Sequence, residues 1–361
     1  MSNTYRVQNP ATDEIVETFD SATDAEVEGV LAKAAAAYRE WSARPMSERA
    51  EIVARAASLF AERKEELAKI AAEEMGKPIS EGIEEAEFSA AIIKYYADNG
   101  EEFTKDQPIP ASANGTAVIR RLPIGPLLGI MPWNFPYYQI ARFVGPNLVL
   151  GNTIVLKDAE ICPRSALAVQ KIMDDAGIPE GVYNNIFATH DQISTIIADP
   201  RIQGVSLTGS ERAGAIVGAQ AGQNLKKAVL ELGGSDPYIL LDTDDVKEAA
   251  KLAWTTRMYN TGQACNSNKR MIVMEDIYEE FVAELTKLAQ AAKAAPADAQ
   301  GEGTYSCLSS RAAAETLHDQ IQRAVKEGAT LRAGGELADK GAFVSPAVIT
   351  DIPVGSDIYY E

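Results

Sequence analysis

Cys265 stands in a run of polar residues where a thiol could do chemistry. Asn260-Thr261-Gly262-Gln263-Ala264 precedes it, and Asn266 and Ser267 follow it. An isolated cysteine is most often a small buried hydrophobic residue, and that interpretation stays open on this stretch alone. The polar neighbours favour a partly hydrated site instead, in which a thiolate can react.

Two more polar side chains follow short apolar runs. Asn134 lies in Pro-Trp-Asn-Phe-Pro, whose prolines restrict the loop, so a rigid amide could donate to a developing oxyanion. The alternative is a turn in which asparagine serves only its turn propensity. Glu231 ends another apolar run, and Gly233 and Gly234 after it would let a ligand or a chain segment approach. Partial burial at this strand tip would raise the pKa of Glu231 toward that of a general base.

Two loops carry groups that suit a nucleotide. Lys157 could pair with ribose or phosphate oxygens, and Glu160 could accept both hydroxyls of an adenosine ribose; an ordinary surface ion pair is the alternative. Thr208-Gly209-Ser210 precedes a predicted helix, whose free N–H groups suit a pyrophosphate. A plain helix N-cap explains that turn equally well, and the chain holds no GxGxxG fingerprint.

Short apolar strands alternating with helices would position these groups. Strands are expected at 127–131, 153–156, 185–187, 205–207, 228–230 and 238–241, and helices at 165–176, 192–198 and 211–221. This order predicts a parallel sheet covered on both faces, a doubly wound α/β fold that binds ligands beyond the carboxyl ends of its strands.

Further elements are expected on either side of this core. A capping box at Thr23 opens a first helix, a second runs from 47 to 75 and stops at Gly76-Lys77-Pro78, and a third covers 83–99. A strand over 116–122 follows. After the sheet come helices at 244–258, 277–292 and 311–327 and strands at 271–274 and 343–349.

Composition narrows the class of protein. The 361 residues are 46% hydrophobic and 24% charged, as in globular proteins of two or three domains. The net charge of −18 argues against binding to nucleic acid or to anionic membranes. Neither a signal peptide nor a membrane span is predicted, and three cysteines suggest reduced thiols, so a cytoplasmic location is expected. No metal-binding spacing is found.

Four motifs in order, Pro-Trp-Asn-Phe-Pro, Leu-Thr-Gly-Ser, Glu-Leu-Gly-Gly and Gly-Gln-Ala-Cys, resemble those of the aldehyde dehydrogenase superfamily. The resemblance covers nearly the whole chain and implies an NAD(P)-dependent enzyme. It implies that Cys265 attacks the aldehyde, forming a thiohemiacetal and then a thioester. The Asn134 side chain and the Cys265 backbone N–H would form the oxyanion hole, and Glu231 would activate the hydrolytic water.

The resemblance also implies a cofactor site. Lys157 and Glu160 would hold the adenosine ribose and Ser210 the pyrophosphate; the remaining cofactor-binding residues would be Trp133, Thr208, Gly209, Leu232 and Gly233. Glu160 favours NAD, because a carboxylate would repel a 2′-phosphate. Lys157 offsets part of that repulsion, so NADP is possible.

Arg142, eight residues beyond Asn134, suggests an acidic substrate. The surrounding sequence resembles bacterial succinate-semialdehyde dehydrogenases, in which an arginine here holds the distal carboxylate; a structural ion pair is the alternative. Some relatives have a second arginine where Tyr259 stands, and Arg257 is out of that register. Glutarate semialdehyde or a neutral aliphatic aldehyde, an inactive cofactor-binding module, and a cysteine esterase are the competing hypotheses.

The expected domain organisation follows the family. Residues 1–107 and 124–230 would form the dinucleotide-binding domain, 108–123 an oligomerisation strand arm, and 231–361 the catalytic domain. The resemblance implies homodimers or homotetramers. Family members usually continue beyond the position of Glu361 with a Glu-(Ile/Leu)-Phe-Gly-Pro stretch, so a truncated catalytic domain is expected, which puts the activity of this chain in doubt.

Overall fold

The computed structural model describes residues 5–110 and 115–360, which form two compact units. The first unit comprises Met1–Arg6, Thr18–Leu67 and Ile83–Leu232, and the second comprises Val7–Glu17, Ala68–Gly82 and Gly233–Glu361. The start of the chain, the tip of the predicted arm at 111–114, and Glu361 lie outside the described residues.

The first unit is built on a parallel sheet in the order β7-β6-β5-β8-β9. The strands are β5 (Pro126–Ile130), β6 (Thr153–Lys157), β7 (Tyr183–Asn185), β8 (Gly204–Thr208) and β9 (Lys227–Glu231). The chain leaves β5 toward β6 and β7 on one side, then crosses to β8 and β9 on the other. The predicted doubly wound α/β fold is confirmed, although β7 lies two residues earlier than expected.

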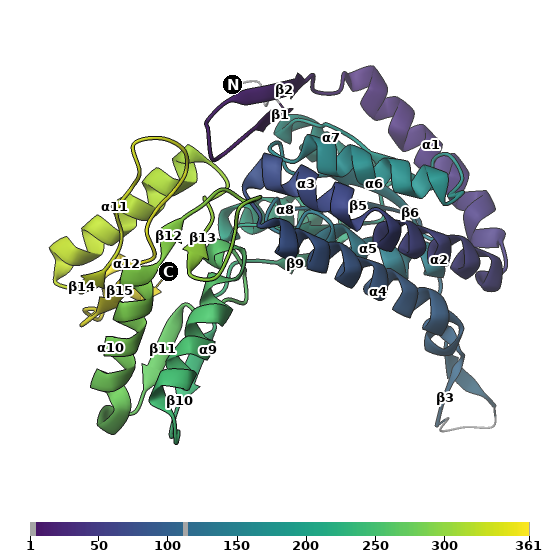
Figure 1. Ribbon diagram of the computed structural model, residues 1–361. Helices are drawn as coiled ribbons and strands as arrows, with labels where there is room; N and C mark the ends of the chain where they lie inside the picture. The colour runs from purple at the N-terminus through teal and green to yellow at the C-terminus, as the bar shows by residue number, and fades with distance from the viewer. Residues whose placement is uncertain (1–4, 111–114, 361) are drawn as a thin grey trace. The chain divides into compact units, whose positions relative to one another are not determined.

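Helices cover both faces of this sheet (Figure 1). On one face α1 (Asp24–Ala43), α7 (His190–Ala198) and α8 (Glu211–Gln223) share an apolar core with β5, β6 and β8. On the other face α5 (Tyr138–Leu150) lies so close that a Cβ at Gly129 would stand 2.6 Å from the Phe143 ring. Behind it, α2 (Met46–Glu62) packs against α5 and α6 (Pro163–Asp175).

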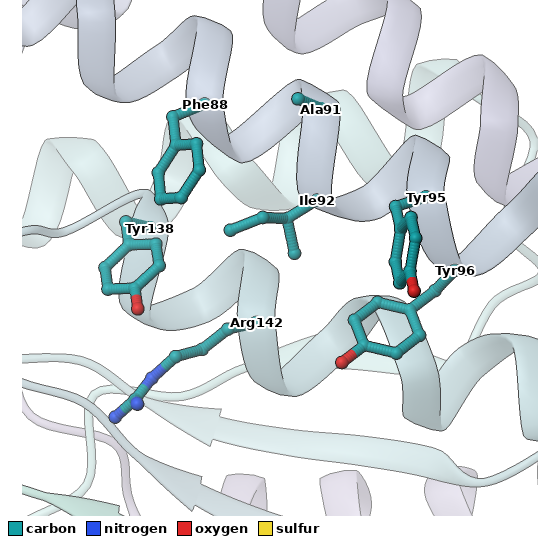
Figure 2. Close-up of a pocket in the computed structure, with 7 residues that line it drawn as sticks. All are labelled: Phe88, Ala91, Ile92, Tyr95, Tyr96, Tyr138 and Arg142. Carbon is teal, nitrogen blue, oxygen red and sulfur yellow. The ribbon is translucent and has the colours of Figure 1, made fainter.

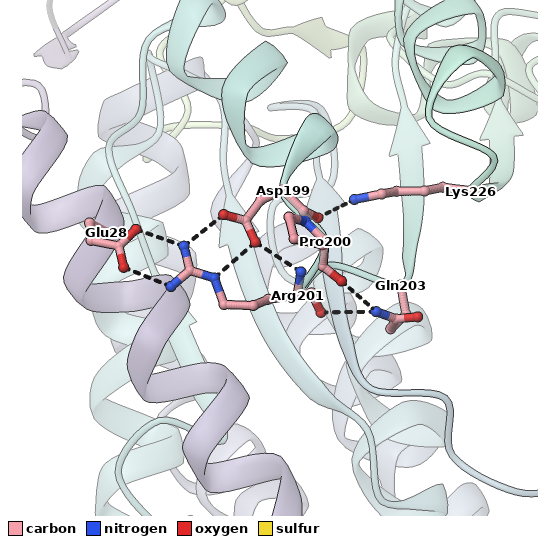
Figure 3. A network of polar contacts seen from close by, with 6 residues as sticks. All are labelled: Glu28, Asp199, Pro200, Arg201, Gln203 and Lys226. Carbon is pink, nitrogen blue, oxygen red and sulfur yellow. Dashed lines mark hydrogen bonds and ion pairs between the residues drawn. The ribbon is translucent and has the colours of Figure 1, made fainter.

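A charged network ties α1 to the amino ends of β8 and β9 (Figure 3). The Arg201 guanidinium donates to Glu28 at 2.6 and 2.7 Å and to Asp199 at 2.6 and 2.8 Å. Lys226 donates to the Asp199 backbone carbonyl. Hydrogen bonds from Arg201 hold the pKa of Asp199 below its usual range. The network lies at the sheet edge opposite the carboxyl ends of the strands and therefore serves the fold.

The second unit has a small parallel sheet of β10 (Pro237–Leu240) and β11 (Arg270–Val273). Its core joins these strands to α9 (Val246–Met258) and α10 (Glu275–Ala291). A 3-10 helix, η1 (Tyr259–Gly262), follows α9. A second core lies around α11 (Arg311–Glu327). The remaining elements of the unit are β12 (Lys293–Ala294), β13 (Thr304–Tyr305), β14 (Thr330–Ala333), β15 (Val348–Thr350) and α12 (Asp357–Tyr360).

The amino-terminal elements differ in part from expectation. The capping box is confirmed, because Thr23 Oγ1 accepts from the Glu26 N–H at 3.2 Å and Glu26 Oε2 from the Thr23 N–H at 2.7 Å. The helix expected at 47–75 is two helices, α2 and α3 (Lys64–Met75), separated at Arg63. The third helix, α4, is longer than expected (Ile79–Thr104), and the paired strands β1 (Tyr5–Gln8) and β2 (Ile15–Phe19) were not expected.

The boundary between the units falls after Leu232, close to the expected position 230. Residues 7–17 and 68–82 cluster with the second unit, whereas the sequence placed them with the cofactor domain. The reason is local packing: the Ile79 N–H donates to the Ala297 carbonyl at 3.1 Å, and the Ala342 N–H to that of Pro10 at 2.7 Å.

In the expected arm, β3 (Gln107–Ile109) and β4 (Ala117–Ile119) form an antiparallel pair of their own. β4 is the strand that was expected at 116–122, and it is shorter than expected. Within residues 5–110 and 115–360, none of the helices combines the length and apolar character of a membrane span.

Candidate functional site

The carboxyl ends of β5, β6, β8 and β9 meet at one edge of the first unit's sheet. Because these strands are parallel, the segments after them emerge together: Trp133 and Asn134 follow β5, Lys157 ends β6, and Thr208 ends β8. The chain direction reverses between β5 and β8, and dinucleotides bind at such switch points in α/β sheets. The fold therefore places these segments at the edge where α/β sheets bind ligands.

Lys157 and Glu160 form a close pair at this edge. Lys157 Nζ donates to Glu160 Oε1 at 2.6 Å, and its side chain is only 6% exposed. His190 Nε2 lies 3.5 Å from the same oxygen. Burial alone would raise the pKa of Glu160, but the charge and hydrogen bond of Lys157 outweigh it and hold that pKa below its usual range. An ion pair is thus present, but with side chains 6% and 30% exposed it is not the ordinary surface pair considered as the alternative.

The turn between β8 and α8 leaves its backbone open. No atom lies within 4 Å of the position that a Cβ on Gly209 would occupy. Ser210 is the N-cap of α8, and its Oγ accepts from the Ala213 N–H at 3.3 Å. A hydroxyl that accepts one hydrogen bond keeps a proton to donate, so this cap is compatible with a bound phosphate. The open backbone and the helix N-terminus fit a pyrophosphate.

Arg142 contacts both Thr208 and Glu231. Its Nη2 donates to Thr208 Oγ1 at 2.8 Å, and its Nη1 lies 3.7 Å from Glu231 Oε2. The Glu231 side chain is 54% exposed, so the expected partial burial of this carboxylate is wrong. Every residue of β9 is exposed, although the other edge strand of the sheet, β7, is mostly buried.

Two hollows in the first unit share Arg142 as a wall. One, of about 420 Å³, lies between α4 and α5 and is mostly aromatic (Figure 2). Figure 2 shows the Arg142 side chain extending toward the strands, and its Cζ lies over the Tyr138 ring, 5.6 Å from the ring centroid. The other, of about 470 Å³, runs along the sheet and reaches Met131, Thr208 and Glu231. A cation between an apolar hollow and the predicted general base suits an acidic substrate.

The loop that carries Asn134 is fixed at its far end by Glu85. Glu85 is 2% exposed, and its Oε1 accepts from the backbone N–H groups of Tyr137 at 2.8 Å and Tyr138 at 3.0 Å. The carboxylate thereby binds two of the free donors at the start of α5. Sequence reasoning missed Glu85. The sequence held one signal for it: Glu85 lies four and eight residues before the buried Ser89 and Ile93 of α4, so it is on the same, inward-facing side of that helix.

Cys265 lies in the second unit, in the loop between η1 and β11. It is exposed, whereas Cys162 and Cys307 are buried, and burial raises the pKa of the Cys307 thiol to about 11. A Cβ on Gly234 would stand 2.8 Å from the Cys265 carbonyl oxygen, so the close approach expected at the glycine pair is observed. Cys265 is thus the accessible thiol among the three cysteines.

The structure brings the first-unit residues to one edge, while Cys265 and Gly233 belong to the second unit. Leu232 is the last residue of the first unit. Its side chain packs on α8, where a Cβ on Gly214 would stand 2.6 Å from Leu232 Cδ2. The meeting of Cys265 with Asn134 and Glu231 stays a prediction.

A parallel sheet whose chain direction reverses between β5 and β8 is the architecture of dinucleotide-binding α/β proteins. The sequence profile of the aldehyde dehydrogenase family matches residues 1–361, and the chain belongs to that family of oxidoreductases.

Similar proteins include a succinate-semialdehyde dehydrogenase (NADP+) of Deinococcus radiodurans, 47% identical over 99% of this chain and 75% of the relative. One of the same name from Mycobacterium avium is 39% identical over 98% of this chain and 75% of its own. The crystal structure of succinic semialdehyde dehydrogenase from Streptococcus pyogenes in complex with NADP+ superposes with a TM-score of 0.95. It is 40% identical and covers 99% of this chain and 78% of that one. The chain is thus shorter than these relatives.

Proposed function

We propose that this protein oxidises succinate semialdehyde to succinate with a nicotinamide cofactor, NADP+ in preference to NAD+. The similarity to the Deinococcus enzyme, 47% identity over 99% of the chain, carries the proposal. The position of Arg142 beside the aromatic hollow supports an acidic aldehyde of short chain. Another acidic or aliphatic aldehyde is the alternative within the family.

The proposed chemistry begins with the Cys265 thiolate, which attacks the aldehyde carbon. The Asn134 amide and the Cys265 backbone N–H donate to the oxyanion that forms. A nicotinamide cofactor would supply the hydride acceptor for oxidation of this thiohemiacetal to a thioester. Glu231 then takes a proton from the water that attacks the thioester, and succinate leaves as the Cys265 sulfur is released. The exposure of Glu231 suits this step, because the base must reach water.

The proposed cofactor site uses the groups at the carboxyl edge of the sheet. Gly209 and Ser210 would receive the pyrophosphate, and Lys157 and Glu160 the adenosine ribose, with Trp133, Thr208, Leu232 and Gly233 along the cofactor. Glu160 alone would favour NAD+. Its carboxylate is engaged by Lys157 at 2.6 Å and faces His190 at 3.5 Å, which reduces its repulsion of a 2′-phosphate. This pairing and the names of the relatives support NADP+.

Arg142 is proposed to bind the substrate carboxylate. Its side chain is 28% exposed, and its guanidinium can exchange the contact with Glu231 for the incoming carboxylate. When Arg142 exchanges its contact with Glu231 for the substrate carboxylate, Glu231 would become free for the hydrolytic step.

The β3–β4 pair is proposed to contribute to subunit contacts. Ile109, Val118 and Ile119 are 41%, 48% and 45% exposed on these short strands. Apolar side chains on unpaired strand edges favour pairing with another chain.

The test is reduction of NADP+ by the purified chain with succinate semialdehyde, beside Cys265→Ala. We expect turnover by the wild type and none by the variant. A variant that retains its rate would show that the nucleophile is another residue. Calorimetric binding of NADP+ without turnover of any aldehyde by the wild type would contradict the proposed activity.

A further inference from the structure

Arg257 extends from the last turn of α9 onto the loop that carries Cys265. Its Nη1 donates to the Gly262 carbonyl at 2.7 Å and to Ser267 Oγ at 2.7 Å. One acceptor precedes Cys265 and the other follows it, so one guanidinium nitrogen bridges the two ends of this loop. Ser267 is only 4% exposed, and the bridge is therefore shielded from water.

The backbone of this loop needs outside support. Asn260, Thr261 and Gly262 are consecutive residues in the left-handed region, with φ of 50°, 54° and 77°. Left-handed conformations of residues with a Cβ are unfavourable and persist where the surroundings impose them. Glu81 Oε2 accepts from the Asn260 N–H at 2.6 Å at the start of the run, and Arg257 binds the Gly262 carbonyl at its end.

The guanidinium also lies directly against the turn. A Cβ on Gly262 would stand 2.7 Å from Arg257 Nη1, so a side chain at this position would displace the guanidinium, and the φ of 77° also favours glycine. Arg257 is half-buried, and this partial burial lowers the pKa of its guanidinium. A cation that is partly removed from water depends on its hydrogen bonds, and both of the bonds described here go to the Cys265 loop.

We propose that Arg257 is a positioning residue for the nucleophile. By holding Gly262 and Ser267 together, it fixes the path of the chain through Cys265, and hence the direction of the thiol and of the backbone N–H. The inference rests on the proposed function of Cys265. It also explains why Arg257, out of register for a second substrate arginine, stands close to the nucleophile in sequence.

The experiment compares Arg257→Met and Arg257→Lys with Arg49→Met. Arg49 is the control, because its guanidinium also holds backbone carbonyls, those of Val149 and Leu150 of the first unit, at 3.0 and 3.1 Å; Arg49 is buried (4% exposed), whereas Arg257 is half-buried. Two quantities are measured: hydrogen–deuterium exchange of segment 258–270, and kcat and KM for succinate semialdehyde and NADP+.

For Arg257→Met we expect exchange in segment 258–270 to accelerate about tenfold. We expect kcat to fall about 10- to 100-fold with both KM values within about threefold, because displacing a reacting group by about 1 Å costs up to about 100-fold. Arg257→Lys should recover part of kcat. Arg49→Met should lower the Tm and leave both exchange in this segment and kcat per folded chain unchanged.

If Arg257→Met does not fold, Ser267→Ala removes one of the two bonds without removing the cation, and we expect its kcat to fall about 3- to 10-fold. Unchanged exchange and unchanged kcat in a folded Arg257→Met, or an unchanged kcat in Ser267→Ala, would overturn the proposal. A wild type that oxidises no aldehyde would contradict the proposed function instead, while the exchange measurement would still report whether Arg257 holds the loop.

Discussion

Replacing Arg142 with methionine should separate acidic from neutral aldehydes. Methionine keeps most of the side-chain length and removes the charge. A hydrogen bond to a charged group contributes about 1.5–3 kcal/mol net. The full range corresponds to about 10- to 150-fold in kcat/KM, since about 1.4 kcal/mol is tenfold.

The contacts of Arg142 in the structure make the expected loss of kcat/KM smaller than this range. Before it binds substrate, Arg142 already donates to Thr208 at 2.8 Å and faces Glu231 at 3.7 Å. A neutral hydrogen bond contributes about 1 kcal/mol and an exposed ion pair about 0.2–1 kcal/mol, and both are exchanged when the substrate binds. We therefore expect kcat/KM for succinate semialdehyde to fall about 3- to 20-fold in Arg142→Met, because the difference of these contributions is about 0.7 kcal/mol for mid-range values and about 1.8 kcal/mol at most.

The assay follows the absorbance of the reduced cofactor with succinate semialdehyde and with butanal, its neutral analogue of equal chain length. Kinetic constants for butanal should change little, and Arg142→Lys should give an intermediate loss because it keeps the charge but not the planar geometry. Equal losses for both aldehydes would refute the carboxylate contact. Arg142 would then act through Glu231 or through the fold alone.

Three further outcomes are expected. Iodoacetamide at mildly alkaline pH should label Cys265 before Cys307, whose buried thiol has a pKa raised to about 11; peptide mapping that finds Cys307 labelled first would contradict this. Gly129→Ala should lower the free energy of unfolding by about 1–3 kcal/mol because its Cβ would meet the Phe143 ring, whereas Gly209→Ala, in open space, should keep the Tm and weaken cofactor binding in calorimetry. Arg201 lowers the pKa of Asp199, so this pair stabilises the fold above the ordinary pKa of aspartate, and the contribution is lost as pH falls through the lowered pKa. Urea unfolding across acidic pH should therefore show a smaller loss of stability in Arg201→Met than in the wild type, and parallel curves would argue against a role for the pair.

Elements with strong local signals could be predicted from the sequence. The capping box at Thr23 and the stop at Gly76, whose φ is 77°, depend on residues adjacent in the chain. The break at Arg63 could not be predicted, because no glycine or proline marks it. The strand expected at 343–349 is observed as Val348–Thr350, whose pairing with β14 joins segments distant in sequence.

In the candidate site, too, some features follow from the local sequence and others depend on tertiary contacts. The positions of Lys157 and Thr208 at strand ends follow from the alternation of strands and helices, which is legible in the sequence. The exposure of Glu231 does not, because it depends on which tertiary neighbours cover β9. The contacts of Glu85 with Tyr137 and of Arg257 with Ser267 depend on tertiary folding, which a single sequence does not specify.

The place of β5 between β6 and β8 also bears on synthesis by the ribosome. While residues 131–203 emerge, one edge of β5 has no partner, since β8 has not yet been translated. An open edge carrying Leu127 and Leu128 is prone to non-native pairing. Nascent chains arrested before Gly204 should therefore recruit general chaperones more strongly than chains extended beyond Glu231.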